Sequence, residues 1–170
     1  MHEVGHGLGL AHPHDNGDID PDNSSEIMQG VTQPFDDPGT FGLNVGYATI
    51  MSYNTDSERT PGVLDIALLQ QKYGVNTTSH SGDDVYVIPT TQPFAQSFGV
   101  IWDVGGTDTI SFSGAGDTRI DLRAASLRSE LNGAGTPSTA VAANGATIDG
   151  FVIAHGVVIE NATSGAGIDA

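Results

Sequence analysis

The chain has 170 residues, and its 21 acidic and 5 basic side chains give a formal net charge of −16 at neutral pH. This balance argues against nucleic acid as a partner, because phosphate binding needs cationic patches. The sequence has no cysteine for disulfides, no apolar run long enough to span a membrane, and no secretory signal peptide at its start. Its acidity fits exposure to extracellular calcium, although solubility alone would also explain it.

The first element is a short predicted helix with closely spaced histidines. His2 and His6 lie four residues apart, so both imidazoles share one helix face. Together they can hold one zinc ion, and His12 can supply the third protein ligand that catalytic zinc sites typically use. Because a continuing helix would carry His12 away from the ion, we expect the chain to turn at Gly9, which tolerates a left-handed backbone.

Glu3 directly follows the first histidine. Its carboxylate can take a proton from a zinc-bound water and return it to a leaving group. The alternative is a set of ordinary surface histidines, but Gly9 and His12 at fixed offsets make a chance match rare. The segment therefore predicts a zinc hydrolase site with Glu3 as the general base.

Residues 13–26 form an acidic segment. Asp18, Asp20 and Asp22 alternate like calcium ligands, but Asn23 stands where an EF-hand loop needs Gly. We therefore expect a solvent-exposed acidic loop.

A second motif, Met51-Ser52-Tyr53, lies about forty residues beyond His12. Together with the histidine pattern it resembles the metzincin zinc proteases, and within them the serralysin and astacin branches. The resemblance implies that Met51 forms an apolar floor beneath the zinc and that Tyr53 approaches the metal and stabilises the oxyanion. Taken alone, Met and Tyr side chains would indicate ordinary core packing.

Residues 61–74 predict a packed helix. Pro61 suits a first helical position, Leu69 and Tyr73 lie on a stripe that we expect to be buried, and Gly74 is a suitable stop. The segment resembles the helix that ends the serralysin protease domain, which makes the serralysins the nearer branch.

Beyond Gly74 the composition changes to short runs of Val, Ile, Thr and Phe separated by Gly, Asp and Ser. Such runs predict the strands of a β domain. The clearest runs are residues 84–88, 100–102, 109–112 and 148–159. Residues 133–145, rich in Ala, Gly, Ser and Thr, predict a loop.

Residues 81–86, 102–109 and 153–162 resemble segments of the serralysin C-terminal domain, whose equivalent loops bind calcium. Carried over by position, the resemblance implies calcium ligands from the carbonyls of His80, Gly82 and Gly105 and the side chains of Asp84, Asp103, Asp108 and Glu160. Calcium takes six to eight oxygen ligands, which suits carboxylates mixed with glycine-rich carbonyls. Any one of these acids taken singly would indicate a solvated loop residue.

The motifs at the two ends of the chain resemble parts of longer structures. Residues 164–170 match one Gly-Gly-x-Gly-x-Asp calcium nonapeptide, with Ser164 in place of the first Gly. One repeat cannot build a β-roll, because each turn needs neighbours. The zinc motif begins at residue 2, without the sheet that precedes it in metzincins. We therefore expect an internal piece of a larger protease.

The sequence thus predicts an α+β fragment. Residues 1–74 would form the lower half of a metzincin catalytic domain, with active-site helix, Met-turn and C-terminal helix. Residues 75–170 would form a calcium-binding β domain leading into a parallel β-roll. The resemblance implies a zinc endopeptidase with one catalytic Zn²⁺, several structural Ca²⁺ ions and protein or peptide substrates. It also implies a monomer, secreted by a bacterium through a C-terminal signal beyond this piece.

The alternative from another class is a non-enzymatic, calcium-binding β module. Such a protein would be an adhesin or an exported structural protein with a vestigial zinc site. A decayed site should have lost ligands, and none of His2, His6 and His12 is missing. The intact motif favours descent from an active enzyme.

Overall fold

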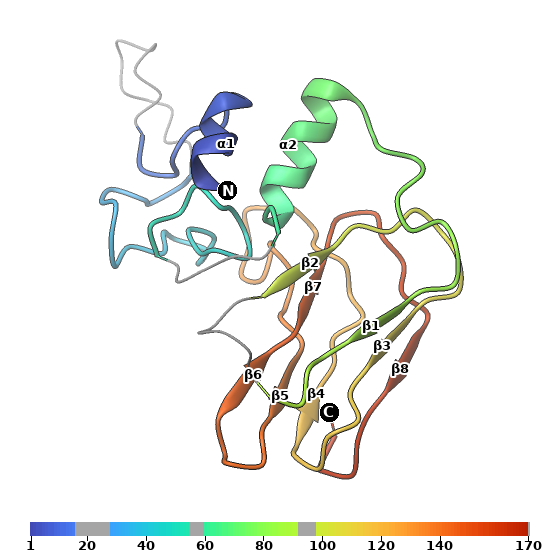
Figure 1. The fold of residues 1–170 in the computed structure, drawn as a ribbon. Helices are drawn as coiled ribbons and strands as arrows, with labels where there is room; N and C mark the ends of the chain where they lie inside the picture. Colours follow the sequence, from blue (N-terminus) through green and yellow to red (C-terminus); the bar gives the residue numbers. More distant parts are fainter. Residues whose placement is uncertain (16–27, 55–59, 92–97, 170) are drawn as a thin grey trace.

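The two helices and the strands occupy opposite ends of the molecule (Figure 1). The computed structural model describes residues 1–15, 28–54, 60–91 and 98–169. The acidic segment with Asp18, Asp20, Asp22 and Asn23 lies outside these described residues. No helix among the described residues combines the length and apolar character needed to cross a membrane.

Helix α1 (His2–Gly7) is the predicted histidine helix. Beyond it, Gly9 adopts φ 85°, and the Leu10 N–H turns back to the Gly5 carbonyl at 3.0 Å. A positive φ is readily reached only by glycine, so the predicted turn at Gly9 is confirmed. This turn redirects the chain toward His12.

Helix α2 (Val63–Tyr73) begins two residues later than the pattern predicts. Gly62, rather than a residue before Pro61, is its N-cap, and the Gly62 N–H donates to the side chain of Asp65 at 2.7 Å. A side chain at Gly62 would lie 2.4 Å from the main chain of Ala48, so only glycine allows this close approach. The predicted stop at Gly74, with φ 93°, is confirmed.

The strands form three small sheets. The parallel sheet has the order β1 (Val85–Val87), β3 (Thr109–Ser111) and β8 (Asn161–Thr163). A second parallel pair joins β2 (Gly99–Ile101) and β7 (Phe151–Ile153). The antiparallel sheet has the order β4 (Thr118–Arg119), β5 (Thr139–Val141) and β6 (Thr147–Asp149).

Two segments of this β region differ from the prediction. Residues 148–159 do not form one strand, because Gly150 separates β6 from β7 and a turn follows Ile153. A side chain at Gly150 would lie 2.6 Å from the Ser138 carbonyl oxygen, so the main chains approach closely at this glycine. The loop predicted for residues 133–145 contains β5, since its Ala140 is buried between β4 and β6.

One hydrophobic core joins the helical and strand regions. Ala48 and Val63 are fully buried in the same cluster as Ile110, Ile148 and Val152 of the strands. The burial of aliphatic side chains on both sides of residue 74 stabilises α2 against the sheets. The predicted division into residues 1–74 and 75–170 stays a proposal.

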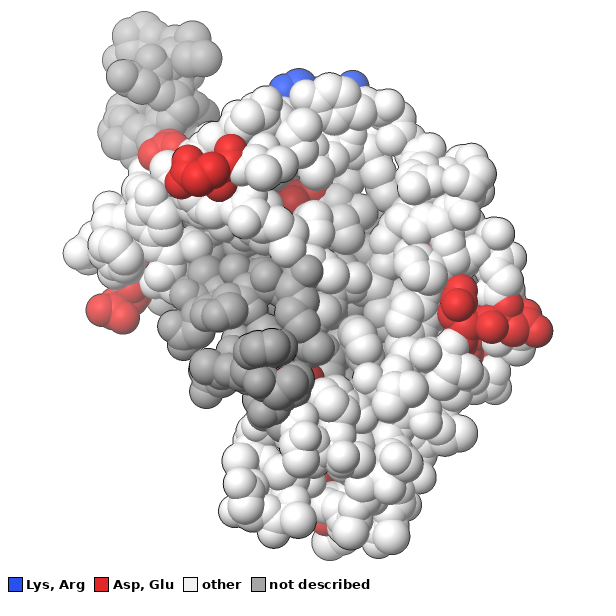
Figure 2. Space-filling view, in the orientation of Figure 1, with Lys and Arg blue, Asp and Glu red and all other residues white. Residues whose placement is uncertain are grey.

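The surface carries the acidity of the chain in separate patches. On the face in Figure 2, acidic side chains are divided by uncharged surface, and basic side chains appear only at the upper edge, above the C-terminal end of α2. Tyr73 at that end is 60% exposed, so its predicted burial is wrong. Its hydroxyl instead donates to the Leu8 carbonyl at 3.1 Å.

Candidate metal centres

The structure brings the three predicted zinc ligands together beside α1. The Nε2 atom of His12 lies 3.1 Å from Nε2 of His2 and 3.0 Å from Nε2 of His6. The two helical histidines lie one turn apart, and the turn at Gly9 returns the third to the same point. Three imidazole nitrogens therefore converge on one position.

The other ring nitrogen of each histidine faces a hydrogen-bond acceptor. Nδ1 of His2 lies 2.7 Å from the Ile50 carbonyl oxygen, and Nδ1 of His6 lies 3.1 Å from the Leu10 carbonyl oxygen. Because a carbonyl oxygen only accepts, both Nδ1 atoms carry the proton. The Nε2 atoms then present lone pairs, as metal-binding histidines require.

His12 is oriented by Asp15, a residue that the sequence reasoning missed. The Asp15 carboxylate accepts from the His12 main-chain N–H at 2.9 Å and lies 2.8 Å from Nδ1 of His12. Burial would raise the pKa of Asp15, but these hydrogen bonds outweigh it and lower the pKa. The signal in the sequence was an acid three residues after the third histidine of the zinc motif.

His14 is a second residue of this cluster that the motif did not predict. Its ring stacks on His12 at 4.8 Å between centroids, and its Nε2 lies 3.9 Å from an oxygen of Asp15. Burial and the neighbouring His12 lower the pKa of His14. His14 thus closes one side of the histidine cluster.

Tyr53 lies beside the histidines, and Glu3 lies on the helix that carries two of them. The Tyr53 hydroxyl is 2.9 Å from Nε2 of His12, and the Tyr53 ring, 39% exposed, stacks on His2 and on Phe35 with centroid distances of 5.3 Å. Glu3 is exposed in the first turn of α1. A phenol therefore accompanies the three imidazoles, and a carboxylate follows the first of them on the same helix.

Met51, predicted to form an apolar floor beneath the zinc, packs against Gly5 of α1. It is 1% exposed and clusters with Leu10 and Ile50. A side chain added at Gly5 would meet its sulfur at 2.6 Å. The glycine within the histidine motif therefore has a packing role that spacing alone did not reveal.

A buried carboxylate on α2 fixes the Met51 segment. Asp65, 1% exposed, accepts from the Thr49 hydroxyl and from the Ile50 N–H, both at 2.7 Å. The carbonyl of the same Ile50 residue accepts from His2. Burial raises the pKa of Asp65, and its hydrogen bonds oppose that rise. Sequence reasoning placed Asp65 within a packed helix and missed this contact.

The predicted calcium ligands meet at one end of the parallel sheet. Asp84, Asp108 and Glu160 each directly precede a strand of that sheet, β1, β3 and β8 respectively. The register pairs Val85 with Thr109 and Thr109 with Asn161, so the three acids stack at the same edge. The Asp108 N–H donates to the Glu160 carboxylate at 2.7 Å.

The carboxylates of Asp84, Asp103 and Asp108 form the centre of this cluster. Their ligand atoms lie within 4.8 Å of one another, and Asp103 and Asp108 are 4% and 0% exposed. Oδ2 of Asp108 is buried and has no hydrogen-bond partner among the described residues. Like charges this close favour a cation between them. The oxygen-only donor set fits calcium.

The remaining predicted ligands border this cluster. The Gly105 N–H donates to Asp103 at 2.9 Å, and the His80 carbonyl accepts from the Val104 N–H at 3.4 Å. The Gly82 carbonyl approaches Gly106 so closely that a side chain there would lie 2.1 Å from it. The contacts place all three predicted carbonyl residues on the loops that carry the carboxylates.

Tyr86 is an unpredicted member of the carboxylate cluster. Its hydroxyl donates to Asp103 at 2.5 Å. Burial and this hydrogen bond raise the pKa of the Tyr86 hydroxyl well above its ordinary value. The phenol therefore stays protonated and satisfies one oxygen of Asp103.

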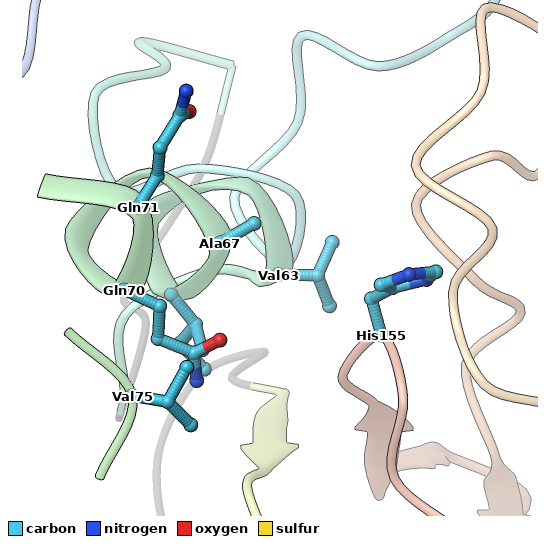
Figure 3. Close-up of a pocket in the computed structure, with 7 residues that line it drawn as sticks. Val63, Ala67, Gln70, Gln71, Val75 and His155 are labelled. Atoms are coloured by element: carbon cyan, nitrogen blue, oxygen red, sulfur yellow. The ribbon is translucent and has the colours of Figure 1, made fainter.

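A separate pocket of about 260 Å³ lies between α2 and the turn after β7. Val63 and His155 face each other across it, as Figure 3 shows. Nδ1 of His155 lies 2.8 Å from the Ala125 carbonyl oxygen, so this histidine is held within the β region. None of the predicted metal ligands lines the pocket.

Comparison with known proteins agrees with the resemblance. The chain is 36% identical to Serralysin C of Dickeya chrysanthemi, over 99% of this chain and 34% of that protein. It is 31% identical to Serralysin of Proteus mirabilis, over 99% and 33%, and 30% identical to Metallopeptidase AprA of Pseudomonas marginalis, over 99% and 35%. The chain therefore spans about a third of the length of the curated relatives it matches.

The family described as Peptidase M10 serralysin C terminal matches residues 64–170. This match includes most of α2 and every strand in the described part of the chain. It extends over more than half of the 170 residues. The chain therefore belongs to the serralysin family.

Proposed function

We propose that this chain carries the zinc ligands and catalytic groups of a secreted zinc endopeptidase. The observation that supports this most strongly is the convergence of three imidazole Nε2 atoms at 3.0 and 3.1 Å. With both carbonyl-facing Nδ1 atoms protonated, these lone pairs repel one another unless a cation lies between them. Zinc–nitrogen distances of about 2.0–2.1 Å in a tetrahedral site match this spacing. In this proposal His2, His6 and His12 are the zinc ligands.

Zinc, when bound, would supply Lewis acidity to the substrate carbonyl and to water. The Glu3 carboxylate takes the proton of the attacking water and delivers it to the leaving amine. The Tyr53 hydroxyl, already beside the metal position, donates a hydrogen bond to the carbonyl oxygen as negative charge develops there. Met51 and Gly9 support the site through packing and the turn.

Peptide bonds are the proposed substrate, because the matched relatives are named serralysins and a metallopeptidase. We also propose secretion from a bacterial cell, as the resemblance to the serralysins implies. We further propose a monomer and a division into a catalytic part, residues 1–74, and a calcium-binding part, residues 75–170, that leads into a parallel β-roll.

The β part would bind structural calcium. The buried oxygen of Asp108 and the convergence of Asp84 and Asp103 support this role. The proposed ligands are His80, Gly82, Asp84, Asp103, Gly105, Asp108 and Glu160.

The deciding experiment combines zinc stoichiometry with peptide hydrolysis. We expect one zinc per chain, lost in His12→Ala, and cleavage of a quenched peptide that falls by at least about a hundredfold in Glu3→Ala. A longer chain with added upstream sequence is assayed in parallel, with a chelator control. If the zinc-loaded longer chain showed no Glu3-dependent cleavage, the protease proposal would fail.

One observation favours the second candidate, a non-enzymatic calcium-binding module. The family match begins at residue 64 and so leaves the histidine motif outside it. Under that alternative, calcium would still stabilise the fold, and the longer chain would bind zinc without hydrolysing peptide.

A further inference from the structure

Two side chains at the end of α2 reach one carbonyl at the end of α1. Lys72 Nζ donates to the Leu8 carbonyl oxygen at 2.7 Å, and the Tyr73 hydroxyl donates to the same oxygen at 3.1 Å. The last carbonyls of a helix have no donor within the helix. Lys72 and Tyr73 therefore satisfy a group that α1 leaves open.

Lys72 also brings a positive charge to the carbonyl end of α1. It is the only lysine of the chain, and residues 1–58 contain neither Lys nor Arg. A cation near the C-terminal end of a helix is stabilising. The Lys72 ammonium further lies 5.3 Å from the centre of the Tyr73 ring, which holds the two donors beside each other.

The carbonyl that they hold lies within the turn between two of the histidines. Gly9 follows Leu8 directly, and a side chain at Gly9 would lie 2.3 Å from Lys72 Nζ. The Leu10 N–H then donates to the Gly5 carbonyl, and the Leu10 carbonyl faces Nδ1 of His6. The position of this turn therefore sets both the tilt of His6 and the return of the chain to His12.

A single exposed lysine contact usually contributes little to stability. Here two donors from adjacent residues meet one oxygen, and Tyr73 stays 60% exposed although its helical position predicted burial. An aromatic side chain loses favourable burial in that arrangement, so the contact with Leu8 is the interaction that explains its orientation.

We propose that Lys72 and Tyr73 form a clamp on Leu8 that positions His6 and His12 for zinc. Both are positioning residues, since neither touches the metal position. This inference rests on the proposed zinc site. The clamp also ties that site to α2, which packs on the strands through Val63.

The test uses Lys72→Met, Tyr73→Phe and their combination, with Gln71→Met as the matched control. Gln71 precedes the clamp on the same helix, and in Figure 3 its side chain extends away from Val63 and His155. Zinc affinity is measured by competition with a chelator, and amide hydrogen exchange of residues 8–12 is measured without metal. Circular dichroism melting checks that each variant is folded.

We expect each single substitution to weaken zinc binding about three- to tenfold, and the combination by about tenfold or more, as for other residues that orient metal ligands. Exchange at Leu10 should accelerate by a similar factor in metal-free protein. Lys72→Arg keeps a cationic donor and should restore most of the affinity, and Gln71→Met should stay within about twofold.

The outcomes separate this inference from the proposed function. If the original chain binds no zinc, the proposed function fails, and the exchange measurement still decides whether the clamp holds the turn. If the chain binds zinc and the combined variant binds it equally tightly with unchanged exchange, the clamp is overturned. A loss of affinity in Gln71→Met equal to that in Lys72→Met would also overturn it.

Discussion

The histidine cluster and the carboxylate cluster are built in opposite ways. The histidines come from eleven consecutive residues on one short helix and one turn, and they remain partly exposed. The carboxylates come from separate loops, one with Asp84 and one with Asp103 and Asp108, and Asp103 and Asp108 are buried. One cluster is held by local backbone geometry, the other by the register of parallel strands.

This difference teaches which physical cost each site carries. The histidines are partly exposed, so water can still solvate the metal-free cluster and reduce its cost. Buried carboxylates repel one another and lose hydration, so the fold around them depends on a cation. We therefore expect calcium binding to change the free energy of unfolding, and zinc binding at the histidines to change mainly the hydrolytic activity.

The largest expected change in the free energy of unfolding comes from calcium binding at the carboxylate cluster. Calcium at about a hundred times its dissociation constant should raise the free energy of unfolding by about 2.7 kcal/mol. Asp108→Asn should remove most of that rise, and in calcium-free buffer it should be neutral or stabilising, because one buried charge is gone. Urea unfolding with and without calcium measures both effects.

The control for that experiment is Asp36→Asn. Asp36 lies on the surface loop near Tyr53, and its φ of 56° suits asparagine. Its calcium response should equal that of the unchanged chain. Full calcium stabilisation in Asp108→Asn would show that the carboxylate cluster does not depend on a cation at Asp108.

A smaller effect is expected at Asp65, which gives the histidine region its own buried carboxylate. Asp65→Ala leaves the Thr49 hydroxyl and the N–H groups of Ile50 and Gly62 without their acceptor. We expect a loss of about 2 kcal/mol, since unsatisfied buried donors are costly. Asp65→Asn, which retains an acceptor oxygen, should lose less.

Urea unfolding of both Asp65 variants in metal-free protein gives these values. If Asp65→Ala cost less than about 0.5 kcal/mol, a level typical of surface changes, the histidine region would depend on local geometry alone.

Two glycines of α1 give opposite predictions. Gly5→Ala places a methyl group 2.6 Å from the Met51 sulfur, and we expect destabilisation of about 1 kcal/mol or more. At Gly7 nothing lies within 4 Å, so Gly7→Ala should stabilise by up to about 1 kcal/mol through helix propensity. Thermal melting of both variants checks the signs, and equal signs would contradict the packing of Met51 under α1.

The smallest expected effect is a pH dependence in the β region. Hydrogen bonds from Arg123 lower the pKa of Asp121 below its ordinary value of 3.8. The stability that this pair contributes is therefore present above that ordinary pKa and is lost as the pH falls through the lower folded value. Arg123 is 81% exposed, so solvent screening keeps this contribution small.

Asp121→Asn tests this pair by thermal melting at a series of acidic pH values. The difference from the unchanged chain should shrink as the pH falls below about 3.8, the ordinary Asp pKa. A difference that grew toward acid would have the wrong sign for a lowered pKa.

The sequence predicted best those features that are local. The spacing of His2, His6 and His12 and the turn at Gly9 depend on backbone geometry within one helix and one turn, and the structure places them as expected. The stop at Gly74 was predictable for the same reason. A glycine adopts a positive φ because it lacks a side chain, whatever its distant contacts are.

Features set by distant contacts escaped prediction. Asp65 looked like an ordinary helical acid, because its partners lie in a segment about fifteen residues earlier. The helical period placed Tyr73 on a stripe of buried residues. In the structure its hydroxyl instead donates to the Leu8 carbonyl, and its ring stays exposed. Residues 148–159 were predicted as one run although Gly150 and Gly156 interrupt them, and the Ser138 carbonyl lies against the first of these glycines.

The position of Trp102 has a practical consequence. It is the only tryptophan of the chain, it directly precedes Asp103, and its indole N–H donates to the Asn76 carbonyl at 3.2 Å. The fluorescence of Trp102 should therefore respond to the arrangement of the loop beside the carboxylates. The aromatic side chains at the histidines are instead those of Tyr53 and Phe35. The chain thus contains its own optical probe for one metal event, which can be followed without a label while the other is titrated in the same sample.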